Sequence, residues 1–302
     1  MTKQKTLKSA IGCTGIALHS GRKTTLNLKP AEANAGIRIR RTDLVNGASE
    51  IVVDWSKVVD TQLATTVGND YGTTVSTIEH LMSALAGCEI DNLVIEVDGP
   101  EIPIMDGSAS PFVFLIECAG VAELEAPRKA IKILKPVTVG DGDRSLTILP
   151  SDEFSLSFEI DFDNAAIDRQ QYAFENLDSD FKADIARART FGFEKEVDAL
   201  RSAGLALGGS LDNAVVVGED RILNEEGLRY ADEFVRHKIL DCIGDLYLAG
   251  GPIIGEVRAS RSGHELNNAL LRAVFDDDTA WTLVDAEPRR HAVEAQAIEA
   301  VA

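Results

Sequence analysis

The sequence has little cysteine, no long apolar run and no excess of positive charge, and each shortage excludes a class of protein. Its four cysteines, among 302 residues, show no Cys-x-x-Cys spacing, which argues against a disulfide scaffold or a cysteine-type zinc finger and fits a reducing compartment. No apolar run approaches the roughly 20 residues of a membrane-spanning helix. The basic start is not followed by the apolar stretch of a secretory signal. We therefore expect a cytoplasmic protein without a transmembrane segment.

Positive charge is scarce overall but gathers at the beginning of the chain. The net charge of −19 argues against nonspecific binding to nucleic acid. Residues 1–41 nevertheless carry nine lysines and arginines and a single acid, Glu32. This basic segment either faces an anionic ligand or consists of exposed charges on strands, and both interpretations stay open.

The hydrophobic fraction of 45% and the charged fraction of 26% are those of a globular protein with a sizeable core. Alternation of apolar and polar residues predicts strands, and apolar residues spaced by three and four predict helices. The predicted strands are residues 24–30, 36–40, 92–97, 131–134, 145–149, 154–160 and 253–257. The predicted helices are residues 78–86, 110–119, 178–188, 194–203, 231–249 and 262–275.

Both halves of the chain repeat the order strands, helix, strand, helix. This repetition predicts an α+β fold, a two-domain sandwich of similar halves, in which each half is a sheet with helices and the helices pack between the layers. We expect the first domain at residues 1–126, the second at residues 127–285 and a surface tail at residues 286–302.

Only five histidines occur, and three of them lie in polar clusters within predicted helices. In the helix at 231–249, His237, Asp241 and Asp245 span about 80° of one face, opposite the apolar residues. The His-x-x-x-Asp pair has the spacing with which two side chains grip one ion. A solvated polar face with a His–Asp hydrogen bond explains this helix equally well.

The helix that contains residue 80 shows a similar division. His80 lies about 200° around the helix from the apolar Ile78. If His80 binds a metal, the neighbouring Glu79 would lie beside that metal without being a ligand. Alternatively, Ser76-x-x-Glu79 is a capping box, in which Glu79 closes the start of the helix.

The simplest arrangement packs the polar faces of these two helices against each other, between the two halves of the chain. His80, His237 and Asp241 would then form a set of two histidines and one carboxylate with an open fourth position, the pattern of a catalytic zinc site. The same set also suits a non-haem Fe(II) oxygenase. A third hypothesis is a non-catalytic protein that binds a nucleotide sugar or a lipid, which has no need of a Glu79–His80 pair.

The cluster at residues 262–268 adds a candidate acid. It places His264 in the first turn of a helix, where backbone N–H groups favour a developing anion. Asp245 is spaced to orient His264 and keep it protonated. The alternative is helix capping by the neighbouring serine and glutamate, with His264 merely exposed. A metal flanked by Glu79 and His264 has the parts for hydrolysis, namely a Lewis acid, a base and an acid.

Around these residues the sequence resembles a known family, the zinc-dependent UDP-3-O-acyl-N-acetylglucosamine deacetylases of Gram-negative lipid A synthesis. The resemblance covers roughly residues 4–280. The blocks that carry it are GCTGIALHSG at 12–21, TIEHLMSA at 77–84, IMDGSA at 104–109, RTFGF at 189–193, GLALGGS at 204–210, NEEGLR at 224–229, FVRHKILD at 234–241 and SGHELNN at 262–268.

The resemblance implies a metal centre and a set of catalytic groups. The metal is Zn²⁺, with Fe²⁺ an alternative in the cell, and its ligands are His80, His237 and Asp241. The catalytic residues are the general base Glu79, the general acid His264, the oxyanion donor Thr190, and Asp245, which holds His264. The implied reaction removes an N-acetyl group and releases acetate.

The resemblance also implies a small-molecule substrate, a nucleotide sugar that carries an acyl chain. The implied substrate-binding residues are Lys238, Phe191 against the glucosamine ring, Leu63, His19 and, in an acyl passage, Val197, Leu200, Ala206, Gly209 and Val216. A small satellite core explains any one of the passage residues equally well. We expect a monomer with no nucleic-acid partner.

Overall fold

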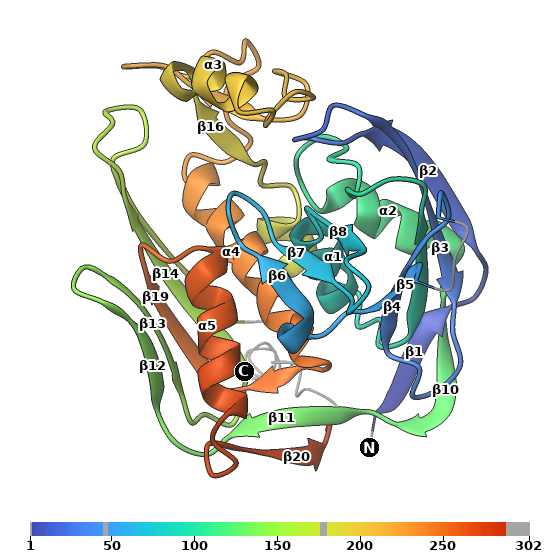
Figure 1. Ribbon diagram of the computed structural model, residues 1–302. Helices are drawn as coiled ribbons and strands as arrows, with labels where there is room; N and C mark the ends of the chain where they lie inside the picture. Colours follow the sequence, from blue (N-terminus) through green and yellow to red (C-terminus); the bar gives the residue numbers. More distant parts are fainter. Residues whose placement is uncertain (1, 45–47, 176–179, 288–302) are drawn as a thin grey trace, which may run out of the picture.

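The computed structural model describes residues 2–44, 48–175 and 180–287. Its two largest sheets, of five strands each, form the outer layers of a sandwich, and the helices other than the yellow α3 (Glu194–Ser202) lie between them (Figure 1). The α+β class predicted from the sequence is therefore confirmed. Among the helices of the described residues, none has the length and apolar character needed to cross a bilayer.

The first large sheet comes from the N-terminal half of the chain. Its strands lie in the order β2 (Ile11–Ile16), β3 (Lys23–Pro30), β9 (Leu93–Val97), β4 (Ile37–Arg41) and β5 (Glu50–Val52). β4 and β9 pair in parallel, and the other neighbours are antiparallel. Leu26 and Leu28 are fully buried because alternate side chains of a strand point to the same face.

The second large sheet repeats this topology. Its strands lie in the order β12 (Val137–Asp141), β13 (Arg144–Leu149), β19 (Glu256–Ser260), β14 (Ser155–Asp161) and β15 (Arg169–Phe174). Again the third and fourth strands are parallel and the others antiparallel. The two halves therefore share one strand order and one set of pairing directions.

The helices follow the same repeat. In the first half, α1 (Glu79–Gly87) precedes β9 and α2 (Ser110–Ala119) follows it. In the second half, α4 (Glu233–Leu246) precedes β19 and α5 (His264–Phe275) follows it. α2 begins and ends where the sequence predicts, with Pro111 in its first turn. α3 (Glu194–Ser202) belongs to an insertion before α4.

Four smaller sheets complete the described fold. They are β1 (Lys3–Leu7) with β10 (Val121–Pro127); β18 (Ile253–Ile254), β11 (Lys129–Ile133) and β20 (Trp281–Asp285); β6 (Val58–Asp60), β7 (Thr66–Gly68) and β8 (Thr74–Val75); and β16 (Phe191–Phe193) with β17 (Val215–Val217). The short helical turns are η1 (Trp55–Lys57), η2 (Phe181–Ile185) and η3 (Tyr247–Ala249).

The chain changes sheets at Arg128, between β10 and β11. We propose the domain boundary, expected after residue 126, at this point, because β10 pairs with the N-terminal β1 whereas β11 pairs with strands of the C-terminal half. Of the predicted tail at 286–302, residues 288–302 lie outside the described residues.

Two predicted elements differ from the structure. The helix predicted at 178–188 is a single turn, η2, within the part of that range that is described. The strand predicted at 253–257 is divided at Gly255 into β18 and β19, which belong to different sheets. A Cβ atom at Gly255 would lie 2.9 Å from a side-chain carbon of Ile133. Glycine therefore lets the backbone pass close to Ile133 at this point.

The close approach of α1 and α4 organises the interior. A Cβ atom at Gly244 would lie 2.0 Å from the carbonyl oxygen of Glu79 and 3.1 Å from the amide nitrogen of Ser83. Only glycine permits this backbone contact. Every residue of α1 is buried, so its polar face is enclosed by protein. His237, Asp241 and Asp245 of α4 are buried too, so the solvated face considered for that helix is wrong.

Gly244→Ala should therefore force the two helices apart. We expect the free energy of unfolding of the metal-free protein to fall by about 3 kcal/mol, the upper end of the usual cost of overpacking. Gly192→Ala is the matched control, since nothing lies within 4 Å of its added Cβ atom. Urea unfolding with a chelator present measures both, and equal stabilities for the two variants would contradict the assigned role of Gly244.

Candidate active site

Two buried helices supply the polar cluster. His80 comes from the first turn of α1, and His237 and Asp241 come from successive turns of α4. Nε2 of His80 lies 3.5 Å from Oδ1 of Asp241, and Nε2 of His237 lies 3.3 Å from the same atom. The imidazole centroids are 5.0 Å apart and the rings are nearly perpendicular, at 86°. Both rings thus present Nε2 to one carboxylate oxygen.

These three residues fit a divalent metal ion. Their candidate ligand atoms all lie within 4.8 Å of one another. A tetrahedral ion bound at about 2.1 Å spaces neighbouring ligand atoms about 3.4 Å apart, close to the distances found here. Oδ1 of Asp241 is buried and has no hydrogen-bond partner among the described residues, a deficit that a cation would remove.

Backbone contacts and burial prepare His237 as a ligand. Its Nδ1 lies 3.0 Å from the carbonyl oxygen of Ala188. Because a carbonyl only accepts, Nδ1 carries the proton and Nε2 is free for a metal. Burial lowers the pKa of His237 to about 4, against the opposing effect of Asp241, so its imidazole is neutral.

Asp241 is held in its charged form. Burial alone would raise the pKa of Asp241, but His237 and Lys238 hold it well below its usual value. Nζ of Lys238 donates to Oδ2 of Asp241 over 2.8 Å. Burial disfavours the Lys238 ammonium, yet Asp241 outweighs burial and raises the pKa of Lys238. A fixed positive charge therefore lies beside the three candidate ligands.

Glu79 does not cap its helix, so the capping-box interpretation is wrong. The N-cap of α1 is Ile78, and no side chain caps it, while the N–H of Ser76 donates to the carbonyl of Pro100. Oε2 of Glu79 instead accepts the N–H of Thr65 over 3.0 Å. Burial raises the pKa of Glu79, which makes its carboxylate a stronger base.

His264 lies in the first turn of α5, as the sequence predicts, and is held by Asp245. Its Nδ1 is 2.8 Å from Oδ2 of Asp245. Burial would lower the pKa of His264, but Asp245 and then Glu79 outweigh burial and raise it to about 9. The imidazole is therefore protonated at neutral pH. The capping interpretation is wrong here as well, because no side chain caps α5.

Thr65 joins the candidate base Glu79 to Asp245, the partner of His264, and sequence reasoning missed it. Its backbone N–H binds Glu79, and its hydroxyl donates to Oδ1 of Asp245 over 2.6 Å. The side-chain amide of Asn267 donates to Oδ2 of Asp245 over 2.8 Å. Thr65 is 1% exposed. No motif or spacing marks this threonine, so only the structure identifies it.

Phe191 begins β16 next to the cluster, and Thr190 directly precedes this strand. The N–H of Thr190 donates to the carbonyl of Gly107, and its own carbonyl accepts the N–H of Val215, each over 2.8 Å. The ring of Phe191 lies 6.3 Å from the ring of His237, edge to face. Both residues are thus fixed beside α4.

His19 and Leu63 lie on loops of the first half. The N–H of His19 donates to Glu101, a buried carboxylate that sequence reasoning also missed. Both ring nitrogens of His19 are buried without a hydrogen-bond partner among the described residues. Burial lowers the pKa of His19, Glu101 opposes this shift, and His264 adds to it. Leu63 is exposed, two residues before Thr65.

The residues expected in the acyl passage lie on the insertion around α3. Val197 and Leu200 are half-buried on this otherwise exposed helix, and Val216 lies on β17. Ala206 and Gly209 lie on the loop after α3, which contacts the His19 segment through Leu207 and Gly208 N–H groups. The insertion is thus adjacent to the loop that carries His19.

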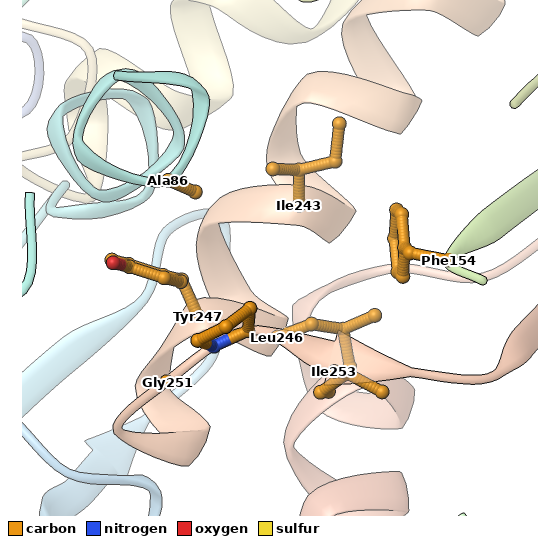
Figure 2. Close-up of a pocket in the computed structure, with 8 residues that line it drawn as sticks. Ala86, Phe154, Ile243, Leu246, Tyr247, Gly251 and Ile253 are labelled. Atoms are coloured by element: carbon orange, nitrogen blue, oxygen red, sulfur yellow. The ribbon is translucent and has the colours of Figure 1, made fainter. Parts of the chain in front are cut away.

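A small cavity lies elsewhere, against the end of α4 that is remote from His237. Figure 2 shows apolar residues that line it, among them Ala86, Ile243 and Phe154. Its volume is about 30 Å³. None of the predicted site residues lines it. It is an apolar hollow with room for about one water molecule, separate from the polar cluster.

Comparison with known proteins finds relatives of one family. The family model described as UDP-3-O-acyl N-acetylglycosamine deacetylase (LpxC) matches residues 4–276. Relatives named UDP-3-O-acyl-N-acetylglucosamine deacetylase include a Vibrio parahaemolyticus protein, 54% identical over 93% of this chain and 92% of its own length. An Acidithiobacillus ferrooxidans protein is 52% identical over 96% of this chain and 95% of its own length. One from Actinobacillus succinogenes is 53% identical over 99% of this chain and 100% of its own length. The chain therefore belongs to the UDP-3-O-acyl-N-acetylglucosamine deacetylase family.

Proposed function

We propose that this protein is a zinc-dependent hydrolase that removes the N-acetyl group of UDP-3-O-acyl-N-acetylglucosamine and releases acetate, in lipid A biosynthesis. The observation that carries the proposal is the convergence of His80, His237 and Asp241 on one point, with Glu79 and His264 near it. The family match and the names of the relatives support the substrate.

The ligand set favours zinc, with Fe²⁺ an alternative in the cell. Two neutral imidazole nitrogens and one carboxylate oxygen, with a position left for water or substrate, are typical of catalytic zinc. When bound, zinc supplies a Lewis acid for the acetamide carbonyl and lowers the pKa of water to about 7.

The surrounding side chains have complementary tasks in amide hydrolysis. Glu79, buried and more basic than usual, takes the proton of the attacking water. The hydroxyl of Thr190 donates to the oxyanion that develops on the carbonyl oxygen. His264, held protonated by Asp245, gives its proton to the leaving amine. His264 thus has the charge that its step requires.

Substrate binding uses side chains around this centre. Lys238 contributes a fixed positive charge beside Asp241, and Phe191 provides an aromatic face beside His237. Leu63 and His19 contact the sugar and its substituents, and the acyl chain follows the insertion past Val197, Leu200, Ala206, Gly209 and Val216. The protein acts on this small molecule in the cytoplasm as a monomer.

Acetate release from UDP-3-O-acyl-N-acetylglucosamine tests the function. We expect turnover that a chelator abolishes and zinc restores. A non-catalytic binding protein would release no acetate, and an Fe(II) oxygenase would instead consume oxygen. Either result would reject the proposal.

Glu79→Gln tests the base. The amide keeps the size of the side chain and an oxygen that accepts the N–H of Thr65, but it takes up no proton. We expect turnover to fall by about 10²–10⁴-fold, the usual contribution of a general base. Zinc content, measured by atomic absorption, should equal that of the unaltered protein. Comparable turnover in the variant would reject this role of Glu79.

Asp245→Asn tests the acid through the pH profile. A group with a raised pKa is active below that pKa and loses its proton as the pH rises through it, so the basic limb of activity should lie near pH 9. Without the Asp245 charge the pKa of His264 falls, and the basic limb should shift to lower pH. His264→Ala should remove that limb. An unmoved limb in both variants would assign it to another group.

A further inference from the structure

We propose that the buried ion pair of Glu233 and Arg189 is a positioning device for the active site. It joins the helix that carries His237 to the short segment that carries Thr190. Both residues lie outside the groups that touch the reacting atoms. The role of Thr190 in this inference rests on the proposed function, whereas the effect on His237 concerns metal binding alone.

The segment 187–190 contributes two separate groups to the site. The carbonyl of Ala188 accepts from Nδ1 of His237 and thereby fixes the tautomer and the orientation of the ring. Two residues later lies Thr190, whose hydroxyl is the oxyanion donor of the proposed function. A shift of this segment would therefore disturb a metal ligand and an oxyanion donor together.

Glu233 holds this segment on α4. It is the first residue of α4, one turn before His237, and its side chain is 0% exposed. Oε1 accepts both the backbone N–H and Nε of Arg189 over 2.9 Å. Oε2 accepts Nη2 of Arg189 over 3.2 Å and the N–H of Arg229 over 2.6 Å. One carboxylate thus binds two chain segments to the helix that carries His237.

Stability alone is a poor explanation of this pair. Removing two charges from water costs about as much as their attraction returns, so a buried ion pair contributes little net stability. Its geometry is more informative, because a carboxylate with four N–H donors is fixed in direction as well as in place. Arg189 is 3% exposed, so the loss of Glu233 would leave a buried cation that moves toward solvent and takes Ala188 with it.

Glu233→Gln tests the proposal and keeps the side-chain size. We expect the affinity for Zn²⁺, measured by competition with a chelator, to fall about 10–100-fold, as for other residues that orient a ligand. We also expect kcat to fall at least about tenfold while KM stays within about twofold, because orientation and not substrate binding is lost. The melting temperature of the metal-free protein is recorded beside these values.

Glu226→Gln is the matched control. Glu226 also binds Arg189, over 2.7 Å to Nη1, but its side chain is 59% exposed and it does not contact the backbone of the segment. We expect its Zn²⁺ affinity and kcat to stay within about twofold of the unaltered protein. If Zn²⁺ affinity and kcat fell equally in both variants, the loss of a negative charge beside Arg189 would explain the effect. The contacts that Glu233 makes with the backbone would then not be responsible, and the proposal would be overturned.

A second variant covers a failure of Glu233→Gln to fold. Arg189→Lys keeps the positive charge and the backbone N–H bound to Glu233 but removes the forked side-chain contacts, so a smaller loss of Zn²⁺ affinity is expected. Lower stability with unchanged Zn²⁺ affinity and kcat, in whichever variant folds, would make the pair merely structural. If the unaltered protein releases no acetate, the proposed function is rejected. The Zn²⁺ affinities of the variants would still test the role of the ion pair.

Discussion

The backbone contact between α1 and α4 at Gly244 is the constraint on which the candidate site depends. Each helix contributes only part of the cluster, Glu79 and His80 from one half of the chain and Asp241 and Asp245 from the other. Gly244 lies between these two aspartates and touches the carbonyl of Glu79, so the contact that docks the helices also sets the distance between their polar side chains. Core packing and site geometry are therefore one property of this fold.

Burial of so many ionisable groups has a chemical consequence. The pKa of His237 is lowered by burial, whereas that of His264 is raised because the carboxylate of Asp245 outweighs burial. Two histidines in one enclosed space thus differ in charge, since His237 is neutral and suited to bind a metal, whereas His264 is positively charged and suited to donate a proton. The raised pKa of Glu79 makes it a stronger base, so the site has a candidate base on α1 and a candidate acid, His264, on α5. Environments that separate the pKa values of titratable groups in this way are typical of catalytic sites.

Much of this arrangement was predictable where one local pattern decides the outcome. The spacing of His237 and Asp241 and the bounds of α2 follow from helical periodicity. Thr65 was not predictable, because it acts through a backbone N–H and one hydroxyl that leave no mark in the sequence. Ala188 acts only through its carbonyl. The sequence from Ser76 to Glu79 matches a capping box, but tertiary contacts with Pro100 and Thr65 prevail. Strands of two or three residues, such as β8 and β16, are too short to show alternation.

The most direct test of this account is a crystal structure of the zinc-loaded protein with anomalous diffraction recorded at the zinc edge. The account predicts one ion bound by Nε2 of His80, Nε2 of His237 and Oδ1 of Asp241, with a non-protein ligand in the remaining position. An ion at another place, or one closed by four protein ligands, would contradict it.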